Sequence, residues 1–477
     1  MNRILLLTIL LVPLSAHGVL PNFNADYFQN YTSQTFMMPL PVYHNTPATL
    51  GRWGTILAQL NGNNQTACSV TPIYQWSRTW DRSAPYFLMN CKETLFCAGD
   101  AMGYNQYTRD LRAEWFGLPD TFSGTLTCKP WQRVGGAVIS FSQGFGKWTD
   151  WKIFKDWWLE IAVPIISVKQ NLRPQASDNQ LTNALASLRY NAGRMVGYDQ
   201  QKTGVPSVRA ILGATIVDDT NFVLVYHGGL EIPTESRVLP TTLFAPFLGS
   251  NGHISFLNGV FARLNIHTFA STCCSAQIFA SLEHHYYLER DQTRVFDLFN
   301  KQWSRYLPVR REGELTTIPA TNILTRRVTV RPGGFSDLSF GFALAHQNAE
   351  FEFGYALWAH HHERINWPEK PYCDKGIDPL DVYGIAGTTA QTSANASTIA
   401  HQAANDTAFT PIGSSQIDLF SGISRGVLVN RIFIHGSYKG EYKNGNMYLG
   451  LGGTIDFPRE NSALRTAQIW AKIGSQF

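Results

Sequence analysis

The amino-acid sequence predicts an all-β chain that forms a transmembrane, antiparallel, up-and-down barrel of about twelve strands (range about 12–16). Three observations predict this fold. Segments of strand length alternate apolar and polar residues, the connections between them alternate between long and short, and the chain ends in an alternating segment with a terminal aromatic residue. Because successive side chains of a strand face opposite sides, such segments give a sheet one apolar and one polar face.

Twelve segments carry the alternation. In the clearest of them the expected lipid face consists of Phe351, Phe353, Tyr355 and Leu357. One more alternating piece, Ile417–Ile423, is assigned to a loop, because counting it as a strand makes the total odd. The twelve segments span approximately 67–79, 133–145, 157–171, 204–217, 220–232, 253–267, 272–289, 334–346, 348–361, 427–438, 445–457 and 464–477.

The connections give the direction of the barrel. A transmembrane barrel with both termini in the periplasm has short periplasmic turns and long outer loops, whereas a soluble sandwich gives no reason for this alternation. The short connections, which include Asp218–Asp219 and Gln347, are therefore assigned to the periplasmic side. The connections assigned to the outer side are 80–132, 172–203, 233–252, 290–333, 362–426 and the brief last one near 458–463.

The two ends of the chain support export and closure. Arg3, the apolar stretch Ile4–Ala16 and the small residues near Gly18 predict a secretory signal peptide over 1–18, against the alternative of a buried helix. Residues 19–66 are expected to form a periplasmic N-terminal extension or a plug, and 67–477 the barrel. The last segment reads as a closing strand that ends on Phe477, although Ser475 interrupts its apolar face; an ordinary edge strand is the alternative.

Composition narrows the class. Only 16% of the residues are charged, and 13% are aromatic. Outside the signal, the longest apolar run (Ile161–Val168) is far shorter than the roughly 20 residues of a spanning helix, which leaves a secreted soluble protein or a membrane barrel. The net charge of +4 is small and dispersed, so no nucleic-acid partner is expected. Seven cysteines leave one thiol over, with Cys91–Cys97 or Cys68–Cys128 as possible pairs.

Several short stretches carry a resemblance to known proteins. They are Ser69–Tyr74, Trp115–Pro119, Trp303–Tyr306, Asn322–Thr325 and the C-terminal strand. With them, the mature chain resembles Gram-negative outer-membrane β-barrels, and in detail a group of large, uncharacterised barrels of host-associated intracellular bacteria. The resemblance implies a bacterial outer-membrane location and recognition of the terminal Phe477 by the barrel assembly machinery. It implies no activity, so no functional residues are carried over.

The candidate functional residues are charges on the polar faces of the expected strands. They could line a lumen and orient solutes, or they could pair with each other and fill space. The lumen candidates are Arg209, Arg263, Glu283, Asp337, Glu350, Glu352, Arg431 and Lys472, with Glu231, Asp418 and Asp456 as further acidic candidates.

Two other groups of residues are not assigned a functional role. His360–His362, with His284, His285 and Cys373, is the only cluster with metal-ligand chemistry, but at most two rings of the triple histidine share a side, so no metal or other cofactor is expected. Aromatic residues near the strand ends favour interface girdles over loop packing or a sugar platform. These aromatic residues are Trp151, Trp157, Trp158, Tyr286, Tyr287, Trp303, Tyr306 and Trp358.

The sequence therefore predicts a porin-like outer-membrane channel for passive passage of small solutes. The alternative is a non-conducting surface barrel whose long loops bind a host or partner. No enzyme is expected, because no nucleophile motif occurs and Ser281 and His285 lie about 13 Å apart along one strand. The expected partners are outer-membrane lipid, the assembly machinery and small solutes, and the oligomeric state stays open. Twelve strands predict a narrow or plugged pore.

Overall fold

The computed structural model describes residues 65–78, 83–146, 156–269, 274–367, 382–385, 397–402, 411–442, 445–459 and 463–477 of the 477-residue chain. The predicted signal peptide and nearly all of the predicted N-terminal segment 19–66 lie outside the described residues, as do Trp151, Cys273 and Cys373.

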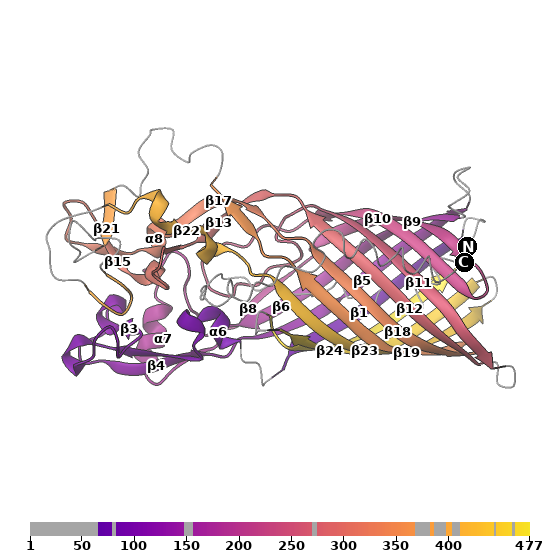
Figure 1. Ribbon diagram of the computed structural model, residues 1–477, viewed down its shortest axis with the longest axis horizontal. Coiled ribbons are helices and arrows are strands. Elements are labelled where there is room, and N and C mark those ends of the chain that lie inside the picture. Colours follow the sequence, from indigo (N-terminus) through magenta and orange to yellow (C-terminus); the bar gives the residue numbers. More distant parts are fainter. Residues whose placement is uncertain are drawn as a thin grey trace.

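Twelve strands form a closed antiparallel sheet in which each strand pairs with its neighbours along the chain (Figure 1). Each of the twelve segments expected from the sequence corresponds to one of them, so the predicted fold class is confirmed. The barrel strands are β1 (Thr66–Ser77), β5 (Trp131–Gly146), β6 (Asp156–Asn171), β9 (Ser207–Asp218), β10 (Phe222–Pro233), β11 (Ser255–Phe269), β12 (Cys274–Tyr287), β18 (Phe335–His346), β19 (Ala349–His360), β23 (Val427–Tyr442), β24 (Gly445–Pro458) and β25 (Thr466–Gln476).

The last strand closes the barrel against the first. β25 pairs with β1 in a register that sets Ile473 opposite Val70, and Ser475 opposite Cys68. The backbone of Phe477 completes this seam, because its N–H donates to the Thr66 carbonyl at 2.9 Å and its carbonyl accepts from the Thr66 N–H at 2.8 Å. The closing-strand interpretation is therefore confirmed, while the role of Phe477 as an assembly signal stays a prediction.

Two strand boundaries differ from the expectation. The segment expected at 204–217 begins earlier, as β8 (Gln200–Gly204), and continues as β9 after an interruption at Pro206. Both pieces pair with β6, and proline interrupts the ladder because it has no N–H to donate. The segment expected at 427–438 runs on to Tyr442 and pairs with β24 from Val429 to Tyr442.

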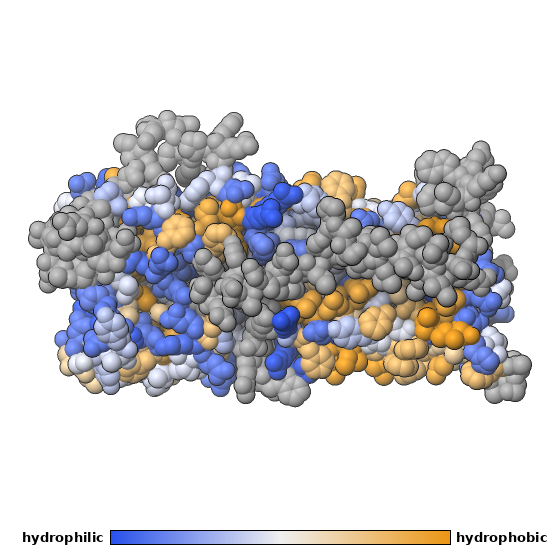
Figure 2. Space-filling view, viewed as in Figure 1, coloured by the Kyte–Doolittle hydropathy of each residue, from blue (hydrophilic) through white to orange (hydrophobic). Residues whose placement is uncertain are grey.

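The two faces of the barrel wall have opposite character. On β19, Phe351 and Phe353 are 45% and 46% exposed, while Glu350 and Glu352 are 7% and 1% exposed. The same alternation holds around the sheet, and Figure 2 shows hydrophobic residues gathered over the barrel strands and hydrophilic residues more frequent on the part remote from the C-terminus. An apolar outer face on a closed sheet is the form in which β-structure crosses lipid.

The long connections fold together into an outer domain at the end of the barrel opposite the C-terminus (Figure 1). Its strands form small sheets, ordered β3-β2-β4-β7, β13-β17-β20, β16-β15-β21 and β14-β22. The strands are β2 (Thr94–Ala98), β3 (Leu111–Arg112), β4 (Ser123–Cys128), β7 (Pro174–Ala176), β13 (Arg290–Val295), β14 (Asp297–Leu298), β15 (Pro308–Arg311), β16 (Thr317–Pro319), β17 (Thr325–Arg331), β20 (Arg364–Asn366), β21 (Tyr383–Ile385) and β22 (Ile417–Asp418).

Short helices complete the outer domain. Among the residues that the structure describes, none of the helices has the length and apolar character of a membrane span. The helices are α6 (Ala84–Phe87), η1 (Met89–Cys91), η2 (Asp100–Met102), η3 (Ala113–Phe116), α7 (Asn179–Leu185), η4 (Ser304–Tyr306), α8 (Thr321–Leu324), η6 (Ser414–Gln416) and η7 (Leu419–Gly422).

One hydrophobic core holds the outer domain together. Each long connection contributes buried side chains to it, for example Phe87, Leu181, Phe244, Tyr306 and Ile399. A single loop could not bury enough apolar surface to be stable, so the connections become ordered by packing on each other.

This core changes the expected role of two aromatic residues. Trp303 and Tyr306 were expected in an interface girdle, but each is 1% exposed and packs inside the outer domain, so that expectation is wrong for them. Their rings meet edge to face at 5.2 Å, and the Trp303 Nε1–H donates to the Phe87 carbonyl. The girdle expectation is also wrong for Trp158, Tyr287 and Trp358, which are buried at 4%, 7% and 3% exposure, whereas Tyr286 is 45% exposed on β12.

The two possible disulfides are not formed. Cys68, Cys91, Cys97 and Cys128 are all thiols. Cys68 lies near the end of the barrel where Thr66 pairs with Phe477, whereas Cys128 ends β4 in the outer domain, so the barrel length separates them. Cys91 is exposed, while Cys97 is 0% exposed in the core.

A charge on the lipid face should impair assembly. Phe353→Arg places a guanidinium on the apolar wall, where it should cost roughly 2–4 kcal/mol at mid-bilayer. Phe353→Leu, the matched apolar control, should keep far more folded protein. The measurement is the heat-modifiable fraction on gels; similar folded yields for Phe353→Arg and Phe353→Leu would contradict the lipid-facing assignment.

The outer domain should lie on the cell surface. An epitope inserted beside Leu315, which is 90% exposed in the outer domain, should bind antibody on intact cells. The same epitope in the β18–β19 turn beside Asn348 should be reached only after the outer membrane is permeabilised. The reverse labelling pattern would mean that the barrel is inserted in the opposite direction.

Candidate functional site

The inside of the barrel is packed with large side chains. Every barrel strand contributes to one cluster of buried apolar residues, which includes Trp158, Phe279, Phe433 and Trp470. Phe279 and Phe433 meet at 6.1 Å between ring centroids, although their strands are three apart around the wall. The lumen is therefore a core in this structure, as expected when few strands enclose a narrow interior.

Glycines on the inner face make room for the tryptophans. A Cβ at Gly213 would lie 2.1 Å from the Trp158 ring, and one at Gly452 would lie 2.4 Å from the Trp470 ring. Each distance is far below van der Waals contact, so these positions require glycine while the rings lie where they are. This explains physically why the polar faces of several strands are rich in glycine.

The first buried ionic network lies in the half of the lumen nearer the outer domain. Glu283 accepts from the Arg209 guanidinium, and its carboxylate lies 2.7 Å from His285 Nε2 and 3.2 Å from His227 Nε2. The nearby Glu231 accepts from the Ser207 hydroxyl at 2.6 Å. Burial of these charges is costly, and the mutual contacts compensate for it.

Two further networks lie elsewhere in the lumen. Arg263 donates to Glu350 at 2.6 Å, and His435 Nδ1 lies 3.0 Å from Glu352. Arg431 donates to Asp456 at 2.8 Å and has Asp337 at 3.9 Å. Glu283 and Asp337 are directly opposite each other on β12 and β18, so the Arg209 and Arg431 networks adjoin.

All eight predicted lumen residues are members of barrel strands on the face away from the exposed apolar residues. Seven of them are less than 9% exposed, and Arg209 has a 14% exposed side chain. Whether they line a pathway stays a prediction, because here they pair and pack. Asp418 is a correction: it lies in β22 of the outer domain, paired with β14, because the segment around it has too few residues to cross the wall.

The histidine cluster is divided between unrelated environments. His285 belongs to the Glu283 network, and His284 Nδ1 lies 2.9 Å from the Ser336 hydroxyl. Burial lowers the pKa of His361 and His362, just beyond β19. Within the described ranges, no group of three His, Cys, Asp or Glu side chains is arranged to hold a metal ion.

A second candidate site is a cavity of about 490 Å³ in the outer domain. We call it the outer pocket. This volume lies within the range of small-molecule sites. It is walled by η1, by β14 with the turn after it, by residues 398–400, and by the β22–η7 segment, and polar and apolar side chains share its lining.

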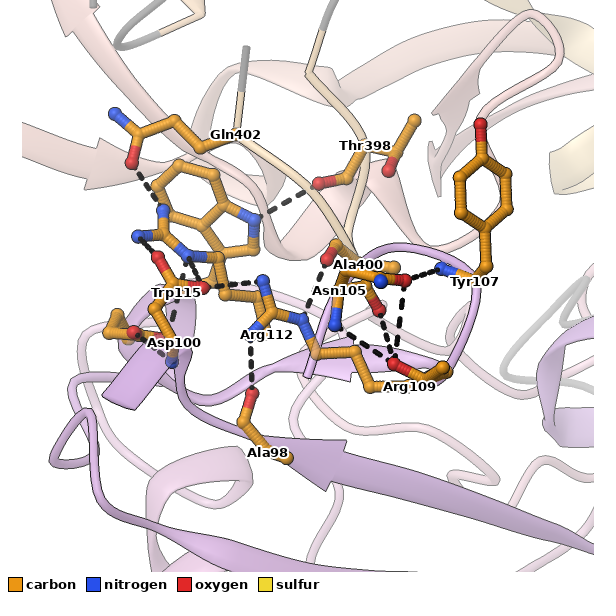
Figure 3. Close-up of polar contacts among 12 residues, drawn as sticks. Ala98, Asp100, Asn105, Tyr107, Arg109, Arg112, Trp115, Thr398, Ala400 and Gln402 are labelled. Carbon is orange, nitrogen blue, oxygen red and sulfur yellow. Dashed lines mark hydrogen bonds and ion pairs between the residues drawn. The ribbon is translucent and has the colours of Figure 1, made fainter. Parts of the chain in front are cut away.

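An arginine clamp positions one wall of the outer pocket (Figure 3). Arg109 donates to the Ala400 carbonyl at 2.9 Å, and Arg112 donates to Gln402. The Trp115 Nε1–H donates to the Thr398 carbonyl at 3.0 Å. Asp100 accepts from both arginines, at 2.6 and 2.5 Å, and these charged bonds lower its pKa against the opposing effect of burial.

The opposite wall carries three ionisable groups. Asp297 forms a two-pronged ion pair with Arg305, at 3.0 and 2.7 Å, and is thereby neutralised. Lys301 is 5% exposed and donates to the Ser397 carbonyl at 2.6 Å; burial lowers its pKa to about 8. Burial raises the pKa of Asp418 to about 6, with the Asp297 charge adding to the effect.

Sequence reasoning missed the outer pocket. Its walls come from segments near Asn90, Lys301, Thr398 and Asp418, which are separated by up to about three hundred residues. No periodic pattern brings such segments together. The helix α7 is capped by Asp178, which accepts from the Gln180 N–H at 2.8 Å, and it ends at Leu185, so Leu188 lies beyond it and is 81% exposed.

Loss of Glu283 should be more damaging than loss of the whole ion pair. Glu283→Gln leaves Arg209 buried without its carboxylate, which should cost about 3–5 kcal/mol. The double variant Arg209→Leu with Glu283→Leu should be closer to wild type in the free energy of unfolding. Urea unfolding in lipid vesicles measures both, and a single variant as stable as wild type would show that the pair is not needed.

Asp418 should make the stability of the outer domain pH-dependent. The pKa of Asp418 is raised in the folded state, so the outer domain is most stable where this carboxyl group is protonated. The free energy of unfolding is therefore highest below about pH 4 and falls as the pH rises through about 6. The loss should approach about 3 kcal/mol, from a shift of about two pKa units. Asp418→Asn should remove this fall in the free energy of unfolding, whereas Asp120→Asn on the exposed surface should keep it. Identical pH profiles for wild type and Asp418→Asn would contradict the assignment.

Among the comparisons with known proteins, only solved structures match this chain. No family model matches the sequence. No curated protein sequence matches it either. Solved structures that match are an outer-membrane channel from Pseudomonas putida F1 (8% identity, TM-score 0.39, 88% of this chain and 98% of that chain) and the transport unit of the autotransporter AIDA-I from Escherichia coli (8%, 0.35, 90% and 98%). Another is a FadL homologue from Pseudomonas aeruginosa (9%, 0.30, 94% and 98%).

The class of the protein rests on its own geometry. The sheet is closed through β1 and β25, its outer face is apolar, and its inner face is polar and packed. The chain is a transmembrane β-barrel protein of the bacterial outer membrane, with a folded domain at the end opposite its C-terminus.

Proposed function

We propose that the protein is a surface-binding protein, in which the barrel is the membrane anchor and the outer domain does the binding. One observation carries this proposal: side chains from all twelve strands meet inside the lumen. The apolar side chains that meet across the lumen leave less room for an aqueous path, whereas the outer domain has a core of its own and a cavity of ligand size. The role is one of binding rather than catalysis.

The organisation of the outer domain supports the proposal. If the loops served only to connect strands, short turns would suffice, as they do at the other end. Instead, the connections supply four small sheets and a shared core, and an arginine clamp orders the wall of the pocket. Rigid support of this kind keeps a recognition surface in its binding conformation, which reduces the ordering cost of association.

Porin-like passage of small solutes is the second candidate. The buried ionic networks favour it, because ionisable residues inside a membrane protein are costly and often mark a solute or ion pathway. In this candidate function, Arg263 and Glu283 would line the path once the aromatic packing loosened. Glu283→Lys would then shift the reversal potential towards anions, and Arg263→Glu towards cations.

Conductance of the purified full chain in planar bilayers separates the two functions. We expect folded, heat-modifiable protein to give no steady open-channel current, because the lumen is packed. The pair Phe279→Ala with Phe433→Ala removes two rings that meet inside the lumen, and it should raise the current above that of the lipid-facing control Phe353→Leu. Steady conductance by the wild type would overturn the anchor proposal and favour the channel.

A further inference from the structure

The outer pocket contains an ammonium group for which the described residues supply no acidic partner. Lys301 is 5% exposed, and within the described part of the chain its ammonium donates only to the Ser397 carbonyl. The nearby Asp297 cannot serve, because its carboxylate is bound by the Arg305 side chain and by the Arg305 N–H at 2.9 Å. A buried cation normally has a counter-charge, and an ammonium can donate three hydrogen bonds. The pocket therefore offers a place for an anionic group.

The same pocket contains a carboxylate that has no basic partner among the residues that the structure describes. Asp418 is 7% exposed and accepts from the Phe420 N–H at 3.0 Å at the start of η7. None of the described residues forms an ion pair with it. The Asp297 charge raises the pKa of Asp418, and the Arg305 charge acts against it. The pocket therefore also offers a place for a cationic group.

Both groups are ionised at neutral pH. Asp418 titrates at about 6 and Lys301 at about 8, so between these values the pocket carries one negative and one positive charge. A simple anion would satisfy Lys301 and leave Asp418 buried and unpaired, and a simple cation would do the reverse. Only a ligand with both charges compensates both desolvation costs.

We propose that the outer pocket binds a zwitterionic small molecule, an amino acid or short peptide, with its carboxylate at Lys301 and its ammonium at Asp418. The apolar lining from Met89, Leu298 and Ile399 suits an aliphatic side chain, and the volume of about 490 Å³ suits a dipeptide better than a single amino acid. This inference rests on the proposed binding role of the outer domain and specifies its ligand class.

Calorimetric titration of the purified full chain with dileucine tests the proposal. Two derivatives separate the charges: N-acetyl-dileucine lacks the ammonium, and dileucine amide lacks the carboxylate. Dileucine should bind, and each derivative should bind about tenfold or more weakly, since a hydrogen bond to a charged group contributes that much. Equal binding of all three, or no binding of dileucine at millimolar concentration, would overturn the proposal.

Variants assign each charge to its residue. Asp418→Asn should weaken dileucine binding and remove its advantage over the N-acetyl derivative, while Lys301→Met should remove its advantage over the amide. Lys92→Met and Asp120→Asn, both outside the pocket lining, are the matched controls and should bind like wild type. A heat-modifiability gel confirms that each variant is folded. If both pocket variants kept wild-type preferences, the charges would not recognise the ligand.

The ligand proposal and the anchor proposal can fail independently, because titration tests the first and conductance tests the second. Failure of dileucine to bind overturns the zwitterion assignment, whatever the conductance. Steady conductance by the wild type overturns the anchor proposal, whatever the titration. Binding with a silent bilayer supports both.

Discussion

Closure of the sheet between β1 and β25 is the constraint on which the rest of the structure depends. Within lipid, no water satisfies a backbone N–H or carbonyl group, so a sheet with free edges cannot cross a membrane. The seam sets Val70 opposite Ile473 and ends with the paired backbones of Thr66 and Phe477. Once the ring is closed, each strand must show an apolar face outward, and all remaining polar side chains are directed into one narrow interior.

That narrow interior explains the packing of the lumen. Large rings such as Trp158 occupy it, and glycines such as Gly213 give up their side-chain volume to admit them. The charges that remain inside are then far from bulk water, so they must be compensated within the wall. Arg209 with Glu283, and Arg263 with Glu350, provide this compensation between strands that are three apart around the ring. Such contacts brace the barrel across its interior as well as along its ladder.

The outer domain obeys a different physical rule. Outside lipid the connections need not alternate apolar and polar residues, and their stability comes from the burial of apolar side chains between loops. The Arg109–Arg112 clamp and the β14–β22 pair illustrate the result, because each joins residues that are more than one hundred positions apart. Recognition chemistry can be built at such junctions without changing the barrel, which separates the requirements of membrane insertion from those of binding.

The sequence by itself determined the barrel. All twelve strands, the side of Phe353 and Glu352, and the alternation of long and short connections follow from a period of two residues, which lipid enforces at every strand. Only the tertiary structure decided which charges pair, that Trp303 and Tyr306 form a loop core, and that Asp418 and Lys301 share a pocket. These features depend on contacts between distant segments with no shared period. Sequence patterns report the local environment of each strand, whereas the outer pocket exists only where separate loops meet.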